Sequence, residues 1–160
     1  MIVVREALEF DRAWLPLLVV EYLKDLAKVD IGVKTDAVSI NNCIESVLSQ
    51  IDSETGAVVI ASEDDWGLVG FSAAGQSFLG PAGFSWGETA GAFGTYVAPN
   101  FRKGGVAKRM RDKLYVALEK KGFKCLIGGV SVDNHAGVFS LRESGFVPYQ
   151  ISGYRLLGRT

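Results

Sequence analysis

The stretch TYVAPNFRKGGVAKRM, residues 95–110, runs from a β-strand pattern through a glycine pair into the start of a helix pattern. Glycines in such a turn let a ligand come close to the main chain, and the first amides of a helix have no internal partners. Together with the helix dipole, these amides form a favourable site for a phosphate group. The stretch therefore predicts an anion-binding turn between a strand and a helix.

The charges around this turn support the same prediction. No Asp or Glu lies between Glu88 and Asp112. The cations of this interval are Arg102, Lys103, Lys108, Arg109 and Arg111. Cations at the start of a helix are unfavourable by roughly a few tenths of a kcal/mol each, and a multiply charged anion would offset this through charge-assisted hydrogen bonds. The alternative is a plain glycine turn followed by solvated lysines on a surface helix.

The composition predicts one globular domain, residues 1–160. Apolar residues make up 48% of the chain and charged residues 22%, which is ordinary for a globular domain. The net charge of −1 argues against a nucleic-acid partner, because such proteins usually carry an excess of positive charge. The clustered cations therefore indicate a local site.

Neither a metal site nor a membrane segment is expected. Cys43 and Cys125 have no metal-like spacing and lie in apolar sequence, so we expect buried, unreactive thiols. The apolar run 14–20 is too short to span a bilayer, and the N-terminal MIVVREALEF does not have the pattern of a signal peptide. A cytoplasmic location follows as an expectation.

Apolar periodicity predicts an α/β chain around one mixed sheet. Strands are expected over residues 2–5, 56–62, 66–74, 89–98 and 124–132, with one or two more within 149–157. Helices are expected over residues 11–28, 36–51, 106–121 and 134–144. Thr35 or Asp36 is the expected cap of the second helix, and Asp133 or Asn134 that of the last. Residues 77–87, rich in Gly, Pro and Ser, should form a loop.

Other phosphate-binding motifs are missing from the sequence. It contains neither G-x-x-x-x-G-K-[ST] nor G-x-G-x-x-G. A dinucleotide site would also need an acidic residue at the end of the strand after the turn, and Asp133 comes somewhat late for that role. A dinucleotide ligand stays open as an alternative.

Two spaced motifs closely resemble the acetyl-CoA-binding core of the GNAT superfamily of N-acetyltransferases. Arg102, Gly105 and Ala107 match the family pattern [QR]-x-x-G-x-[GA] after a strand. Asn134 is followed at the family spacing by Gly145 and Phe146. The resemblance covers nearly all of the chain. It implies a GNAT-like fold, a central mixed and mostly antiparallel sheet flanked by helices.

The resemblance also implies where coenzyme A would bind. Its pyrophosphate would rest on the main-chain amides of Lys103, Gly104, Gly105, Val106 and Ala107. Arg102, at the entry to the turn, would also bind the cofactor. The amide of Val97 would polarise the thioester carbonyl, and Asn134 would contact the pantetheine arm. In this interpretation the cations serve the phosphates of the cofactor.

The sequence departs from the family at the catalytic positions. The Tyr that often protonates the leaving thiolate is replaced by Leu141, and Tyr96, Tyr149 and Tyr154 are possible substitutes. Glu88 is the last carboxylate before the turn and the candidate base. His135, beside a helix cap, is expected to be a surface residue.

The resemblance implies an acetyl-CoA-dependent N-acetyltransferase in which an amine attacks the thioester directly. The acceptor would be a small molecule or a peptide, entering from the side of the first two helices and the 77–87 loop. A homodimer is compatible with the family. A non-catalytic acyl-CoA-binding or regulatory domain is the alternative, and a binder of another phosphate ligand is a third hypothesis.

Overall fold

The computed structural model describes residues 1–64, 66–77 and 88–148. The strands are β1 (Ile2–Glu6), β2 (Gly56–Glu63), β3 (Gly67–Gln76), β4 (Thr89–Val97) and β5 (Cys125–Ile127). The helices are α1 (Leu15–Leu26), α2 (Ala37–Leu48), α3 (Val106–Lys120) and α4 (His135–Glu143). Two short 3-10 helices, η1 (Glu9–Ala13) and η2 (Pro99–Phe101), precede α1 and α3.

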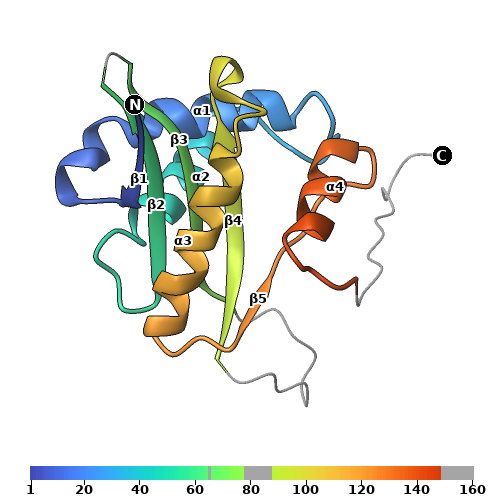
Figure 1. The fold of residues 1–160 in the computed structure, drawn as a ribbon. Helices are drawn as coiled ribbons and strands as arrows, with labels where there is room; N and C mark the ends of the chain where they lie inside the picture. Colours follow the sequence, from blue (N-terminus) through green and yellow to red (C-terminus); the bar gives the residue numbers. More distant parts are fainter. Residues whose placement is uncertain (65, 78–87, 149–160) are drawn as a thin grey trace.

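The five strands form one sheet in the order β1-β2-β3-β4-β5 (Figure 1). The pairs from β1 to β4 are antiparallel, and β5 runs parallel to β4. The helix α3 connects these two parallel strands, as a parallel pair requires a crossover. The expected mixed, mostly antiparallel sheet is thus confirmed.

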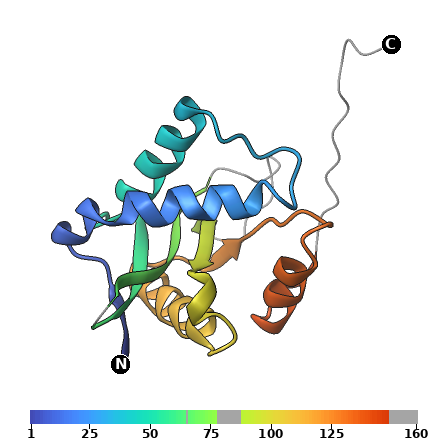
Figure 2. The ribbon, with the colours of Figure 1, turned by 90° about the horizontal axis from the view of Figure 1, so that it is seen from above.

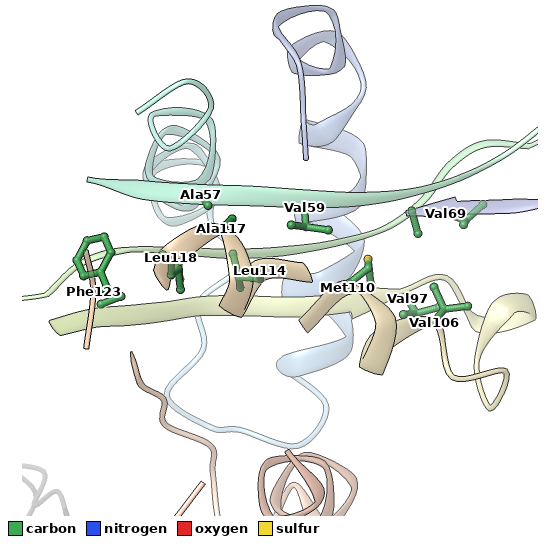
Figure 3. Packing of buried hydrophobic residues seen from close by; sticks show 13 residues of the cluster. Ala57, Val59, Val69, Val97, Val106, Met110, Leu114, Ala117, Leu118 and Phe123 are labelled. Carbon is green, nitrogen blue, oxygen red and sulfur yellow. The ribbon is translucent and has the colours of Figure 1, made fainter. Parts of the chain in front are cut away.

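Helices cover both faces of the sheet (Figure 2). The apolar side of α3 packs on one face, where Met110 and Leu114 meet Val59 and Val97 (Figure 3). The helices α1 and α2 pack on the other face, with Leu15 in the same cluster as alternate residues of β2 and β3. Covering on both faces explains why the β2 sequence is apolar almost throughout.

Local signals placed most helix ends correctly. Asp36 caps α2 by accepting a hydrogen bond from the Ser39 amide at 3.0 Å, and Asn134 caps α4 through the Gly137 amide at 2.9 Å. The predicted helix over residues 11–28 is divided into η1 and α1. Pro16 lies in the first turn of α1, and because it has no N–H it cannot donate to the carbonyl of Arg12.

Three expectations need correction or fall outside the description. The strand predicted over 124–132 ends at Ile127, because Gly128 and Gly129 follow and glycine weakens a strand. Cys43 and Cys125 are only half-buried. Tyr149, Tyr154 and the predicted strands within 149–157 lie outside the described residues, as does the predicted loop from residue 78 to 87.

Within the described ranges, no helix has the length and apolar character that a membrane crossing requires. The same residues contain no group of His, Cys, Asp and Glu side chains that could hold a metal ion.

Candidate functional site: the turn before α3 and the open edge of β4

The turn between β4 and α3 holds its main chain in left-handed conformations. Lys103 has a φ of 65° and Gly105 a φ of 73°. Turns in which left-handed residues alternate with others can direct successive N–H groups into one concavity that suits an anion. The space above the turn is open, since a Cβ built on Gly105 would have no atom within 4 Å.

No side chain in the described part of the chain caps the amino end of α3. Gly105 occupies the N-cap position, and the first turn contains no acidic residue. The first hydrogen bond of the helix runs from the Arg109 amide to the Gly105 carbonyl, at 3.0 Å. The amides that precede Arg109 in the first turn therefore face outward with the positive end of the helix dipole. These amides are where the sequence predicts an anion to bind, and the anion site stays a prediction.

Three of the five cations, however, have side-chain partners within the described residues. Lys108 pairs with Asp112 at 2.6 Å, and Arg109 donates to the Ile2 carbonyl at 3.1 Å. Arg102 is bound to Val97 and to a carboxylate of α1. Lys103 alone among these four has no ion-pair or side-chain hydrogen-bond partner in the described residues. The surplus of positive charge is therefore not explained by an external anion alone.

Main-chain groups at the end of β4 face away from the sheet. Ala98 donates to the Val69 carbonyl at 2.8 Å, and Tyr96 is opposite Phe71 in the register with β3. Because hydrogen bonding alternates along an antiparallel pair, the N–H and C=O groups of Thr95 and Val97 point to the other side. In the described residues β5 pairs with β4 only from Thr89 to Gly91, and the two strands then diverge (Figure 1).

The opened edge follows a bulge that the sequence did not reveal. The register between β3 and β4 shifts between Ala73 and Ala74, which leaves Phe93 as the extra residue. The next residue, Gly94, has a φ of 149°, and a Cβ there would lie 2.7 Å from the Tyr22 ring. A glycine within a strand pattern is the available signal for a bulge. Bulges are frequent beside active sites.

The two tyrosines next to this bulge, Tyr22 and Tyr96, have raised pKa values. Burial raises the pKa of Tyr22 to about 12, with further contributions from Cys43 and Asp30. Burial also raises the pKa of Tyr96, and the charge of Asp25 acts in the same direction. Both hydroxyls therefore stay protonated at neutral pH, and neither is a ready base.

The residues of and beside α4 that were considered for cofactor binding or catalysis make structural contacts. The side-chain oxygen of Asn134 caps the helix, so its expected contact with pantetheine remains a prediction. Leu141 and Phe146 lie against Gly128, the residue after β5. Position 141 thus contributes to packing between α4 and the sheet. His135 is exposed, as expected.

The structure does not bring Glu88 to the turn. Its main-chain carbonyl accepts from the Lys124 amide at 2.8 Å, at the opposite end of β4 from Val97. The two residues are nine positions apart along the strand, about 30 Å at the rise of a strand. We therefore do not assign Glu88 as the base. Val97 lies beside the turn through η2, so the strand end and the turn are neighbours.

Solved structures with this fold cover the whole chain. The aminoglycoside acetyltransferase AAC(6')-Iy, bound to the bisubstrate analogue CoA-S-monomethyl-acetylneamine, has a TM-score of 0.67 at 20% identity, over 98% of each chain. The aminoglycoside 6'-N-acetyltransferase AAC(6')-Ih from Acinetobacter baumannii has a TM-score of 0.70 at 14% identity, over 100% of each chain. AAC(6')-Ig from Acinetobacter haemolyticus has a TM-score of 0.66 at 18% identity, over 99% of each chain.

No protein-family model matches the sequence, and no curated protein sequence matches it either. The structural likeness is nevertheless complete in length, and AAC(6')-Iy has also been solved with CoA alone. At these identities the likeness establishes the fold, and it confirms the fold that the two sequence motifs predicted. The chain has the fold of the GNAT acetyltransferases.

Proposed function

We propose that this protein is an acetyl-CoA-dependent N-acetyltransferase that moves an acetyl group to an amine of a small molecule or peptide. The observation that carries the proposal is the uncapped amino end of α3 beside the open edge of β4. The first feature suits a diphosphate, and the second offers main-chain donors to an acyl group. Similar structures hold CoA in the same fold.

Each part of the site has a role in this reaction. The amides from Lys103 to Ala107 would bind the diphosphate, and the Val97 N–H would donate to the thioester carbonyl. Asn134 would lie along the pantetheine arm. Positioning and a preformed donor can supply most of the acceleration in such a transfer. The acceptor would approach from the side of α1 and α2. On this side the bulge at Gly94 interrupts the regular pairing of β4 with β3.

The transfer itself requires an uncharged amine. Its nitrogen attacks the carbonyl carbon, the C–S bond breaks, and the amine proton passes to solvent or to the departing sulfur. A free alkylamine has a pKa of about 10.4, so at neutral pH only a small fraction is reactive unless the pocket lowers that pKa. With Glu88 distant and Leu141 in packing, we assign no side chain of the described residues to general acid or base catalysis.

The absence of an assigned acid and of an assigned base favours the second candidate, a non-catalytic acyl-CoA-binding domain. Leu141 against Gly128 leaves no phenol at the position where the family often has its acid. In that case the turn would bind acyl-CoA, and the β4 edge would hold it without turnover.

The test is a binding and turnover experiment on the full chain. Calorimetry with CoA, NAD and ATP should show binding of CoA only. Thiol release from acetyl-CoA should then rise with one member of a panel of neamine, kanamycin, spermidine and a short peptide with a free amino end. Aminoglycosides come first because the similar structures include aminoglycoside acetyltransferases. Binding of NAD or ATP without CoA would overturn the proposal, and tight CoA binding without turnover would favour the second candidate.

A further inference from the structure

The side chain of Arg102 connects three parts of the molecule. Its Nε donates to the Val97 carbonyl at 2.8 Å, and its terminal nitrogen pairs with Asp25 of α1 at 2.5 Å. Its guanidinium carbon lies 5.5 Å from the centre of the Tyr96 ring. Arg102 thus joins the turn, the end of β4 and the end of α1.

This contact directs the guanidinium away from the amides of α3. The Tyr96 ring belongs to the apolar cluster under α1 and α2, and it lies near the rings of Tyr22 and Phe71. The first turn of α3 belongs to the cluster on the opposite face, through Val106. The main chain of Arg102 is therefore part of the turn, while its charge lies on the other side of the sheet.

The partner carboxylate is in an unusual place. Asp25 lies in the last turn of α1, where the helix dipole disfavours a negative charge. Hydrogen bonds from Lys28, at 2.7 Å, and from Arg102 hold the pKa of Asp25 below its ordinary value. Arg102 therefore stabilises a carboxylate that is unfavourable for its own helix, and the two residues are 77 positions apart in the sequence.

We propose that Arg102 is a positioning residue that fixes the open end of β4 against α1, and that it is not a ligand of the phosphates. This inference rests on the proposed function, in which Val97 meets the thioester and α1 borders the acceptor. The guanidinium holds the Val97 peptide on one side and α1 on the other. Loss of these contacts would let the Val97 peptide and α1 shift relative to each other. The amides of the turn would remain in place.

The proposal separates catalysis from cofactor binding. Asp25→Asn and Arg102→Gln should each lower kcat about tenfold, because small misplacements of reacting groups are costly, while the Kd for CoA stays within about threefold. The double variant should be no slower than the slower single one, since both substitutions remove the ion pair between Arg102 and Asp25. Arg102→Lys should recover part of the rate, because Lys keeps the ion pair with Asp25 but lacks the planar guanidinium that bonds two partners at once.

Lys28→Gln is the matched control. It removes the other cation from the same carboxylate, and its amine is on an exposed side chain. It should leave kcat and the Kd for CoA at their wild-type values. Circular dichroism should show that all variants are folded, since Arg102 and Asp25 are both partly exposed.

The experiment measures the Kd for CoA by calorimetry, and kcat and KM with the amine of the panel above that gives the highest turnover. If Arg102→Gln weakens CoA binding tenfold or more and Asp25→Asn does not, Arg102 is a phosphate ligand and the proposal is wrong. Wild-type kcat in both variants would also overturn it. If the wild-type chain itself turns over no amine, the proposed function fails first, and this inference falls with it.

Discussion

Gly105 and Gly94 both have positive φ angles, of 73° and 149°, but they differ in what surrounds them. Nothing lies within 4 Å of a Cβ built on Gly105, whereas the ring of Tyr22 fills that place at Gly94. A side chain at Gly94 would therefore have to displace the packed Tyr22 ring. Among the described residues, a Cβ at Gly105 would project into open space beside the first amides of α3, where the proposed ligand would lie.

Gly105→Asp and Gly105→Asn form a matched pair for testing the turn. Both side chains have nearly the same size and both tolerate left-handed φ better than most residues, so the loss of stability should be similar, about 1–2 kcal/mol. Only Asp adds a negative charge. We expect Asp to weaken CoA binding about 10- to 100-fold more than Asn, from a repulsion of about 1–3 kcal/mol.

Calorimetry on both variants measures this difference, and raising the salt concentration should reduce it. Equal affinities for the Asp and Asn variants would show that no phosphate lies at this turn. The chain without ligand serves as the reference for stability, measured by thermal unfolding of each variant.

Among the elements, β1 and η1 are joined by an ion pair with one fully buried member. Arg5 donates two hydrogen bonds to Asp11, at 2.6 and 3.0 Å, and the Leu8 amide donates a third at 2.7 Å. Burial alone would raise the pKa of Asp11, but these hydrogen bonds and the charge of Arg5 hold that pKa below its ordinary value. The carboxylate is therefore stabilised in the folded state.

Asp11→Asn should lower the free energy of unfolding by about 2 kcal/mol at neutral pH, because it leaves Arg5 without its partner. The folded pKa of Asp11 lies below the unfolded value, near 3.9. Its stabilisation is thus complete above that value and is lost as the pH falls through the folded pKa. Urea unfolding between pH 3 and pH 7 should show the two proteins converging in acid.

The exposed pair of Arg12 with Glu9 provides the control for this measurement. Glu9→Gln should change the free energy of unfolding by less than about 0.5 kcal/mol at any of these pH values. A constant difference between wild type and Asp11→Asn down to pH 3 would contradict the linkage.

The sequence predicted individual helices and strands better than it predicted the contacts between them, because its signals are local. The caps Asp36 and Asn134 were predictable because each bonds an amide three residues away. The pair of Arg102 with Asp25 was not, because its members are 77 residues apart and no periodicity connects them. The cations before α3 therefore suggested an external anion, although part of their charge is balanced inside the molecule.

For the candidate site, the sequence predicted the turn at Gly105 but not the distance of Glu88 from it or the bulge in β4. The turn at Gly105 was found because a glycine pair before a helix is itself the signal. The distance of Glu88 from Val97 depends on the length and direction of β4, and the bulge at Phe93 depends on its register with β3. Both are set by packing against neighbouring strands, and the amino-acid sequence alone does not show this packing.

At the scale of the whole molecule, one sheet separates two apolar clusters. Met110 lies in the cluster under α3 and Leu15 in that under α1 and α2, and both side chains are fully buried. The strands β2, β3 and β4 contribute side chains to both clusters. The two faces should therefore unfold together.

Met110→Ala and Leu15→Ala should each lower the free energy of unfolding by about 2–5 kcal/mol, the usual range for such truncations. Each variant should still unfold in one transition, with coincident urea curves from circular dichroism and tryptophan fluorescence. Val116→Ala, on the exposed side of α3, should be close to neutral. Curves that separate in either core variant would show that the two faces unfold independently.

The divergence of β4 from β5 has a consequence for handling the purified protein. Strand edges with unpaired peptide groups are templates for the strands of other molecules. Within the described residues, the main-chain groups of Thr95 and the N–H of Val97 lie on such an edge, while the Val97 carbonyl is already bound by Arg102. We expect concentrated, ligand-free samples to aggregate faster than samples stored with CoA, whose presence would shield the strand from other copies.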